Sequence, residues 1–362
     1  MVLNNVVSFL IAGSILLLAF LLLTNPLQIN KKGNFYFGLC SLCWSTFWLD
    51  EALADQVFVH RPLFILTKGI IQFLVPFLFF ISTLFYTKPI YKFTKKDSLH
   101  LLLPMSYLTL LYYQLFSNQS INNTPIVILI ILNALFYISL AYFTVVKHQR
   151  DIETFVSTKE PVDLNWIKMI IYAITCSIIS TALYTTFINT QALNLYINIF
   201  FLIIAYMIAY FAIKQGEIYP KNIDVNQIVH AQEIEKEQDK NTLMDQADLN
   251  LYKEQLSALM IQQNPYLDSD LNLVKLAEKL GVSTHQLSYV INKGFNENFF
   301  QFINAYRVEK AKELLNNPKY DAYTILAIGY ESGFNSKTTF NTTFKKITKI
   351  TPTQYRNMRS NL

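Results

Sequence analysis

The sequence contains few charged residues and few cysteines for its length. Of its 362 residues, 15% are charged and 52% are hydrophobic, whereas a typical soluble domain carries about 25% charged residues. This deficit excludes a disordered chain, a collagen-like chain and an ordinary soluble protein. Three cysteines are too few for a scaffold stapled by disulfides. At about 150 residues per domain, the length predicts two domains.

The common signatures of catalysis are also missing from the sequence. We find no Walker loop, zinc-protease motif, nucleophile elbow or phosphotransfer signature. The five histidines are scattered, and Cys40 and Cys43 form a C-x-x-C pair with no further ligand nearby in the sequence. We interpret these cysteines as packing residues of a membrane helix. The sequence therefore predicts a protein that is not an enzyme and that has no metal site and no cofactor.

Long apolar stretches dominate residues 1–213. Each has close to the ~20 residues that a helix needs to cross a hydrocarbon core about 30 Å thick. A series of such stretches with short polar joints favours seven transmembrane helices over the buried helices of a soluble protein. The second and fourth stretches are the weakest of the series. The seven are residues 2–23, 35–54, 63–86, 98–116, 126–146, 166–188 and 192–213.

Basic residues in the predicted loops indicate the orientation. With the N-terminus outside, the outer loops carry Arg61 alone, and the inner loops carry Lys31, Lys32, Lys88, Lys92, Lys95, Lys96, Lys147, Arg150 and Lys159. The positive-inside rule therefore predicts a multi-pass protein of the cell (inner) membrane, with the N-terminus outside and the C-terminal domain in the cytoplasm. The first stretch lacks a basic leading region, so we expect no cleavable signal peptide.

The composition changes at Lys214. From Lys214 to Asp270 the chain is polar and net acidic, whereas from Leu271 onward it is net basic. The basic part, about 90 residues long, is large enough for a compact helical fold. We therefore expect a membrane domain in residues 1–213, an acidic cytoplasmic linker in residues 214–264 and a basic helical domain in residues 265–362.

Residues 273–292 have the spacing of a helix-turn-helix. The small Ala277 permits close approach of two helices, and Gly281, four residues later, supplies the positive φ of a sharp corner. Ser283 is a natural N-cap for the second helix, on which Leu287 and Val290 face inward. A plain helical hairpin is the alternative interpretation of this segment.

A second helix pair follows, after an amphipathic helix predicted over residues 299–315. Residues 325–333 form its first helix, which ends at Gly333, and Asn335 or Ser336 caps a second helix over residues 337–348. Three apolar side chains mark the inner face of that second helix at helical spacing: Phe340, Phe344 and Ile347. If both pairs enter the major groove on one face of DNA, they lie about 34 Å apart.

The motifs of residues 265–357 resemble those of AraC/XylS-type DNA-binding domains. The matching segments are Ile303–Arg307, Gly333–Ser336, Phe340, Phe344–Lys346 and Thr351–Arg356. Together with the apolar N-terminal half, the chain resembles bacterial membrane-embedded AraC-type regulators. The resemblance implies an all-α protein: a seven-helix transmembrane bundle followed by a soluble helical domain with two helix-turn-helix motifs. It also implies transcription regulation and double-stranded DNA as a partner.

The second helix of each predicted pair, which begins after Ser283 in the first pair and covers residues 337–348 in the second, is here called a reader helix. Side chains on the outer faces of these two reader helices are candidates for DNA contact. Base edges specify sequence, whereas phosphates position the protein; Asn and Gln suit adenine, and Lys suits guanine. We assign base or sugar contact to His285, Gln286, Tyr289, Lys337, Thr338 and Asn341, and phosphate contact to Lys293, Lys345, Lys346 and Arg356; Thr284, Asn292 and Ser336 complete the set. A solvated surface face is the alternative for each of them.

The chain departs from the family pattern at two positions. Lys349 stands where the family usually has glycine, which costs on the order of 1 kcal/mol if the residue stays left-handed. Thr342 stands where the family often has arginine, which puts one DNA contact in doubt. A further arginine, Arg307, is interpreted either as a DNA contact or as an ion pair with Glu309 or Glu313.

A ligand site is expected near the outer ends of the second and third membrane helices. Asp50, Glu51, Lys68 and Gln72 are polar or ionisable residues at membrane depth, and such residues are functional candidates. Snorkelling of Lys68 to the interface, or its pairing with Asp50, is the alternative.

These observations favour a membrane-bound one-component sensor that regulates transcription, in which the acidic linker passes the signal to the DNA-binding domain. The expected partners are double-stranded DNA, the lipid bilayer, a small-molecule ligand and a second copy of the chain in a homodimer. A membrane transporter or channel with a regulatory DNA-binding tail is the alternative.

Overall fold

The computed structural model describes residues 2–52, 61–116, 124–160, 162–187, 193–216, 218 and 244–359. Within these residues every regular element is a helix, and one isolated β-bridge joins Val156 to Asn272. The all-α prediction is confirmed for this part of the chain. Two compact units are present: Met1–Lys147 with Leu164–Ile218, and His148–Asp163 with Tyr219–Leu362.

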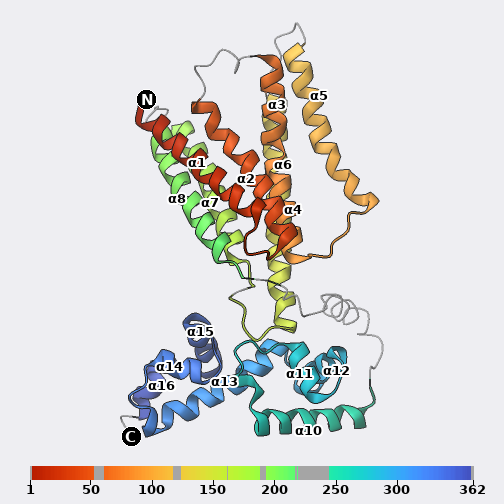
Figure 1. The fold of residues 1–362 in the computed structure, drawn as a ribbon, viewed down its shortest axis with the longest axis vertical. Helices are drawn as coiled ribbons and strands as arrows, with labels where there is room; N and C mark the ends of the chain where they lie inside the picture. Colours follow the sequence, from red (N-terminus) through yellow and green to blue (C-terminus); the bar gives the residue numbers. More distant parts are fainter. Residues whose placement is uncertain are drawn as a thin grey trace. The chain divides into compact units, whose positions relative to one another are not determined.

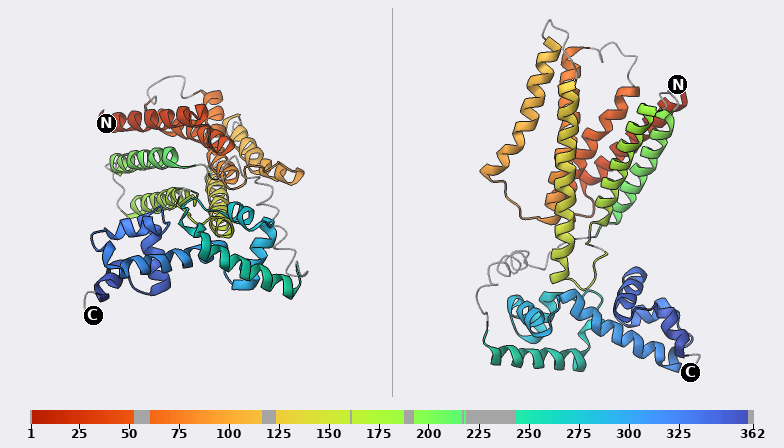
Figure 2. Two further views of the ribbon diagram at one scale, coloured as in Figure 1. Left: turned by 60° about the horizontal axis from the view of Figure 1, so that its bottom comes forward. Right: turned by 180° about the vertical axis from the view of Figure 1, so that it is seen from behind.

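The first unit is a bundle of long helices (Figures 1 and 2). Helix α1 packs along α2 and α8, α2 packs against α4, and α3 packs against α5. The 3-10 turn η2 (Lys95–Leu101) leads into α5. The helices are α1 (Val2–Thr24), α2 (Lys31–Ala52), α3 (Pro62–Phe73), α4 (Val75–Thr87), α5 (Leu102–Phe116), α6 (Thr124–Asp151), α7 (Asn165–Phe187) and α8 (Leu193–Lys214).

Four stretches of helix in the described residues are long and apolar enough to cross a membrane. They are Leu3–Thr24, Pro62–Thr87, Thr124–Thr154 and Leu195–Lys214. The seven predicted crossings are therefore confirmed in part. Helix α5 has 15 residues, which at 1.5 Å per residue reach only ~22 Å, and α2 carries lysines at its start and acidic residues at its end. Part of the side chains of α7 lie outside the described residues.

The third predicted crossing is divided into two helices at Leu74. Helix α3 ends at Phe73, and α4 begins at Val75 with Pro76 in its first turn. Proline lacks an N–H group and its ring clashes with the carbonyl four residues earlier, so a helix breaks there. Close to the break, Nδ2 of Asn133 on α6 donates a hydrogen bond to the carbonyl oxygen of Phe73 at 2.9 Å. This bond ties α6 to the end of α3.

The second unit is built around one central helix, α13 (Phe299–Asn316), close to its predicted bounds. Figure 1 shows two groups of helices arranged along α13. The first comprises α10 (Gln246–Gln263), α11 (Leu273–Leu280) and α12 (Thr284–Tyr289), which continues as a π-helical turn η5 (Val290–Gly294). The second comprises α14 (Ile325–Glu331), α15 (Lys337–Thr348) and α16 (Pro352–Arg359).

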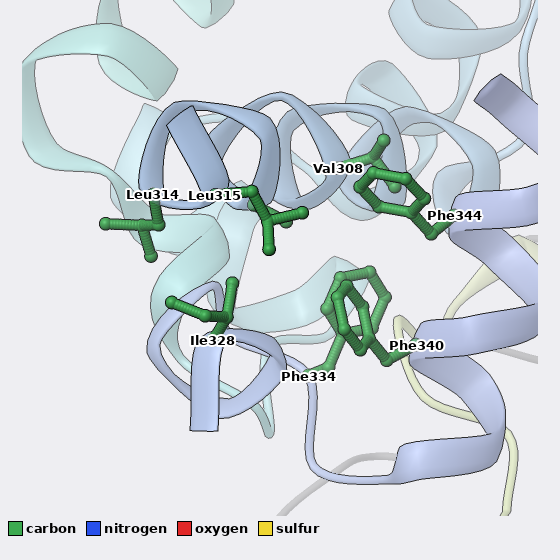
Figure 3. Packing of buried hydrophobic residues seen from close by; sticks show 8 residues of the cluster. Val308, Leu314, Leu315, Ile328, Phe334, Phe340 and Phe344 are labelled. Atoms are coloured by element: carbon green, nitrogen blue, oxygen red, sulfur yellow. The ribbon is translucent and has the colours of Figure 1, made fainter. Parts of the chain in front are cut away.

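An apolar core fixes α14 and α15 against α13. Figure 3 shows Val308, Leu314 and Leu315 of α13 facing Ile328, Phe334, Phe340 and Phe344. The ring centroids of Phe334 and Phe340 are 5.1 Å apart, and Tyr355 of α16 covers Phe344 at 5.5 Å. The prediction that Ile347 faces inward is wrong, since its side chain is 42% exposed. It lies one residue before the end of α15, and Tyr355 covers the core there instead.

Candidate DNA-binding interface

The first helix-turn-helix comprises α11 and α12. Gly281 ends α11 with a φ of +74°, as its position in the sequence predicted. Ser283 then caps α12: its hydroxyl accepts a hydrogen bond from the Gln286 N–H at 3.2 Å, and Gln286 Oε1 accepts one from the Ser283 N–H at 3.0 Å. This reciprocal capping box fixes the start of the first reader helix.

The outer face of α12 carries most of the side chains assigned to DNA in this half. His285, Gln286, Tyr289 and Asn292 are half-buried, and Lys293 is exposed. Thr284 does not belong to this face, because its side chain is buried. The side-chain oxygen of Gln286, Oε1, accepts the hydrogen bond of the capping box. Its side-chain nitrogen, Nε2, is therefore the group that can bind a base edge.

The second helix-turn-helix comprises α14 and α15. Gly333 makes the corner with a φ of +89°. A Cβ atom at Gly333 would lie 2.3 Å from the carbonyl oxygen of Tyr266, so only glycine fits. Ser336 caps α15 and accepts a hydrogen bond from the Thr339 N–H at 3.2 Å. Its side chain is buried in this role, which makes Ser336 a capping residue rather than an outward contact.

Exposed lysines lie at both ends of α15. Lys337 and Thr338 are exposed in its first turn, Lys345 and Lys346 are exposed in its last turns, and Asn341 is half-buried between them. The surface of the second reader helix is therefore basic at its ends and polar at its centre. That distribution suits phosphate contact by the lysines and base contact by the amide.

The structure assigns local structural roles to three further residues of the second half: Arg356, Thr342 and Lys349. Nη1 of Arg356 donates to the carbonyl oxygen of Tyr323 at 2.8 Å, so this guanidinium braces the loop before α14. The Thr342 hydroxyl is turned back onto the Thr338 carbonyl oxygen at 2.8 Å. Lys349 has a φ of +67°, which confirms that the position usually held by glycine is left-handed here.

Arg307 does not form the ion pair with Glu309 or Glu313 that was one of its two interpretations. Glu309 pairs with Lys312 at 2.6 Å and Glu313 pairs with Lys310 at 2.9 Å, whereas the Arg307 side chain is fully buried. Its Nε donates to the carbonyl oxygen of Tyr266 at 2.8 Å, and its Nη2 donates to that of Asp268 at 2.9 Å. Burial lowers the pKa of Arg307 to about 10, so the guanidinium remains charged at neutral pH.

A cavity of about 550 Å³ lies in the first unit, beside the break between α3 and α4. Aliphatic and aromatic side chains form most of its wall, and the aromatic ones include Phe37, Trp44, Trp48, Phe73, Phe79 and Phe201. The Oδ1 atom of Asn133, which also lines the cavity, is buried and has no hydrogen-bond partner among the described residues. This oxygen is a hydrogen-bond acceptor in a cavity that is lined mostly by apolar side chains.

Of the four predicted ligand residues, Lys68 and Gln72 have side chains within the described part of the chain. Gln72 lines the cavity, and Lys68 is not among its lining residues. The side chains of Asp50 and Glu51 lie outside the described residues. Cys40, interpreted as a packing residue, is buried in the cavity wall, and no cluster of three potential metal ligands occurs in the described part of the chain. Asn133, a lone amide in an apolar helix, was predicted to form inter-helix hydrogen bonds, which it does, but it was not among the four predicted ligand residues.

Comparison with known proteins identifies residues 276–358 as a helix-turn-helix domain. A transcriptional regulator of the HTH type from Staphylococcus aureus (strain COL) is 37% identical over 94 residues, which are 26% of this chain and 12% of that protein. An HTH-type regulator from Pseudoalteromonas carrageenovora is 30% identical over 125 residues, which are 34% of this chain and 71% of that protein.

The chain spans only 12% of the length of these staphylococcal relatives. No solved structure matches the chain significantly. The AraC-type resemblance is thereby confirmed for the helix-turn-helix domain. The chain belongs to the family of HTH-type transcriptional regulators.

Proposed function

We propose that this protein is a membrane-bound regulator that binds double-stranded DNA through α12 and α15. The observation that carries the proposal is the pairing of two capped helix-turn-helix units on one continuous helix, α13. A helix of 18 residues is a stiff spacer, so it can hold two reader helices at a fixed separation. Two successive major grooves on one face of DNA require a separation of about 34 Å.

The charges of the reader helices support this proposal. Lys293 follows α12, and Lys337, Lys345 and Lys346 are exposed along α15. Lysines that neutralise phosphates release counterions, which gives affinity that falls steeply with salt. Asn341 lies between the lysines of α15, where an amide can bind adenine through two hydrogen bonds.

Membrane attachment is supported by the surface of the apolar helices. On α1, Leu17 and Phe20 are 60% and 62% exposed, although Ile11 and Ile15 on its other face are buried. A helix that is apolar all round suits lipid contact rather than water. The basic inner loops support an outside N-terminus and a cytoplasmic C-terminal domain in the inner membrane. Self-association into a homodimer stays a prediction.

We place the signal site in the cavity of the first unit. A wall of mostly aliphatic and aromatic side chains with one unpaired acceptor, Oδ1 of Asn133, suits a neutral apolar molecule that carries one hydrogen-bond donor. Transport is the second candidate function, because the helix break before Pro76 borders the same cavity and broken helices form transporter sites. A flux assay in liposomes with the purified chain separates transport from sensing.

The direct test of DNA binding is genomic footprinting with the full chain, comparing Asn341→Ala with Asn357→Ala. Asn357 is exposed on α16 and is the matched control. We expect protection of two sites one helical turn apart on one DNA face, lost with Asn341→Ala and kept with Asn357→Ala. Absence of any protected site, or a C-terminal domain located outside the cytoplasm, overturns the proposed function.

A further inference from the structure

The segment that joins α6 to α7 packs within the helix-turn-helix unit. Residues His148–Asp163, here called the docking segment, form one compact unit with that domain. The 3-10 turn η3 (Ile152–Thr154) packs against α13. Ile152 and Phe155 are buried, with 0% and 4% of their surface exposed. Apolar side chains of this segment are thus part of the interior of the domain.

The docking segment adds a short strand-like edge to the residues that precede α11. Val156 and Asn272 form an antiparallel β-bridge, and the Leu273 N–H donates to the Phe155 carbonyl oxygen at 3.0 Å. Oγ of Ser157 donates to the carbonyl oxygen of Leu271 at 2.6 Å. Main-chain pairing of this kind is how an extended peptide binds the edge of a partner.

Arg307 depends on the docking segment for most of its hydrogen bonds. Its Nη1 donates to the Ser157 carbonyl oxygen at 3.1 Å and contacts Thr158 Oγ1 at 3.5 Å, and its Nη2 donates to Ser157 Oγ at 3.0 Å. These are three of the five contacts of a fully buried guanidinium, whose remaining partners are Tyr266 and Asp268. A buried charge is stable only when its donors are satisfied. The docking segment therefore supplies the acceptors that the buried guanidinium of Arg307 needs.

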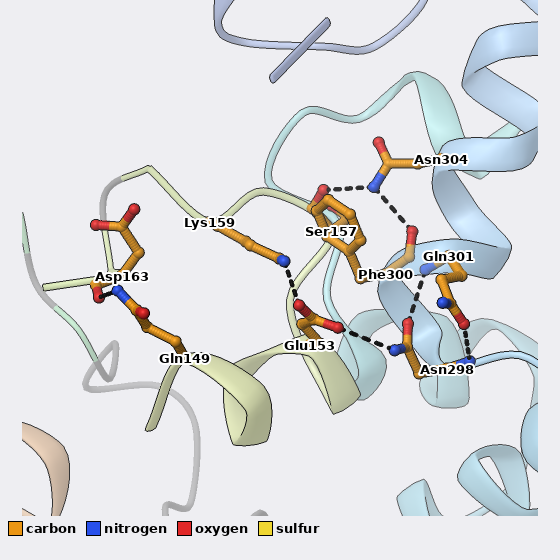
Figure 4. A network of polar contacts seen from close by, with 9 residues as sticks. All are labelled: Gln149, Glu153, Ser157, Lys159, Asp163, Asn298, Phe300, Gln301 and Asn304. Atoms are coloured by element: carbon orange, nitrogen blue, oxygen red, sulfur yellow. Dashed lines mark hydrogen bonds and ion pairs between the residues drawn. The ribbon is translucent and has the colours of Figure 1, made fainter. Parts of the chain in front are cut away.

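A polar network extends the contact to the start of α13 (Figure 4). Nδ2 of Asn298, the N-cap of α13, donates to Oε2 of Glu153 at 3.1 Å. Glu153 also forms an ion pair with Lys159. The Lys159 ammonium lies 4.3 Å from the ring centroid of Phe300. Glu153 and Lys159 of the docking segment are thus paired with each other and with polar and aromatic side chains at the start of α13.

Glu160 of the docking segment reaches the second reader helix, α15. The Thr339 hydroxyl donates to Oε1 of Glu160 at 3.4 Å. Thr339 lies in the first turn of α15, where the helix dipole favours an anion. The carboxylate of Glu160 thus lies where DNA phosphate would approach the N-terminus of that helix.

We infer that the docking segment is a built-in ligand of the helix-turn-helix domain that lowers its affinity for DNA through Glu160. The inference rests on the proposed function, because it assigns the regulation of the same DNA-binding surface. Both ends of the segment continue directly into α6 and α7, so a movement of either helix pulls on it. This direct route takes over the role that the sequence had suggested for the acidic linker.

A disulfide cross-link tests the docking itself. Val156 and Asn272 form a non-hydrogen-bonded antiparallel pair, whose Cα atoms are typically about 4.5 Å apart, within the range that a disulfide spans. We would introduce Val156→Cys and Asn272→Cys into a full chain whose three native cysteines are replaced by alanine, reconstituted in nanodiscs. We expect an intramolecular cross-link in most molecules under mild oxidation. Failure to form it overturns the docked arrangement.

Glu160→Gln tests the inhibition without disturbing the docking. The probe is a labelled 30-base-pair duplex of mixed sequence at low salt, and the matched control is Glu278→Gln, an exposed position on α11. Removing a carboxylate that opposes one phosphate contact should tighten binding about five- to tenfold, whereas the control should change it less than twofold. Equal binding by both variants overturns the inhibition. If the cross-link forms but no variant binds the duplex, the DNA-binding function fails and the docking stands.

Discussion

The Nη1 atom of Arg307 donates to the carbonyl oxygen of Ser157 at 3.1 Å, across 150 positions of sequence. The same guanidinium holds the carbonyl oxygens of Tyr266 and Asp268. One buried side chain therefore joins two separate segments, residues 157–158 and residues 266–268, to the middle of α13. The carboxyl group of Asp268 has a lowered pKa. Burial raises this pKa, but hydrogen bonds from the Asp270 N–H and from Lys275 outweigh burial and lower it.

Replacing Arg307 by lysine should destabilise the helix-turn-helix domain. A lysine ammonium has three donors rather than five and lacks the planar fork of arginine, so carbonyl groups now bound would lose their partners. We expect a loss of about 1–3 kcal/mol, measured as a lower unfolding temperature of the full chain in detergent by scanning calorimetry. Arg61→Lys, at an exposed position, is the matched control. An unchanged unfolding temperature for Arg307→Lys would show that the five contacts contribute nothing.

The two corner glycines should respond differently to alanine. Both have positive φ, but a Cβ at Gly281 meets nothing within 4 Å, whereas one at Gly333 meets the Tyr266 carbonyl oxygen at 2.3 Å. Gly281→Ala should therefore cost only the backbone strain, about 1 kcal/mol. Gly333→Ala adds overpacking and should cost about 2–4 kcal/mol. Urea unfolding of the two variants side by side checks the difference, and equal losses would contradict the close approach of Tyr266 to Gly333.

Lys349→Gly should stabilise the protein. The residue follows α15 with a φ of +67°, a conformation that strains any residue with a Cβ atom and suits glycine. We expect a gain of up to about 1 kcal/mol, reduced by loss of the hydrogen bond from Lys349 Nζ to the Lys346 carbonyl oxygen. The measurement is the unfolding temperature, with Lys349→Ala as the control that removes the amine but keeps the strain. A gain for alanine as large as that for glycine would mean that strain is not the cause.

Features set by neighbours in the sequence were predictable. The corner at Gly281, the cap at Ser283 and the bounds of α13 all follow from local rules of turn and capping. Each of these rules relates residues that lie within about four positions of one another in the sequence. The sequence of one chain therefore suffices to predict these turns and caps.

Features set by distant parts of the chain were not predictable. The partners of Arg307 lie up to 150 positions away, and no residue near it in the sequence points to them. Thr284 has the polarity of a surface residue but turns inward, because tertiary packing decides the side of a short helix. The count of membrane crossings likewise depends on helix length, and α5, with 15 residues, is shorter than its apolar stretch in the sequence suggested.

The last turns of α15 provide a quantitative check of the DNA interface. Lys346 is exposed there and is assigned to a phosphate. Each phosphate neutralised by a protein cation contributes about 0.9 to the slope of log affinity against log salt. Lys346→Ala should therefore weaken binding on specific and mixed-sequence duplex alike and reduce that slope by about 0.9. Lys319→Ala, exposed beyond the end of α13, should leave the slope unchanged. A loss confined to the specific duplex would instead assign Lys346 to a base edge, since base contacts discriminate between sequences and phosphate contacts do not.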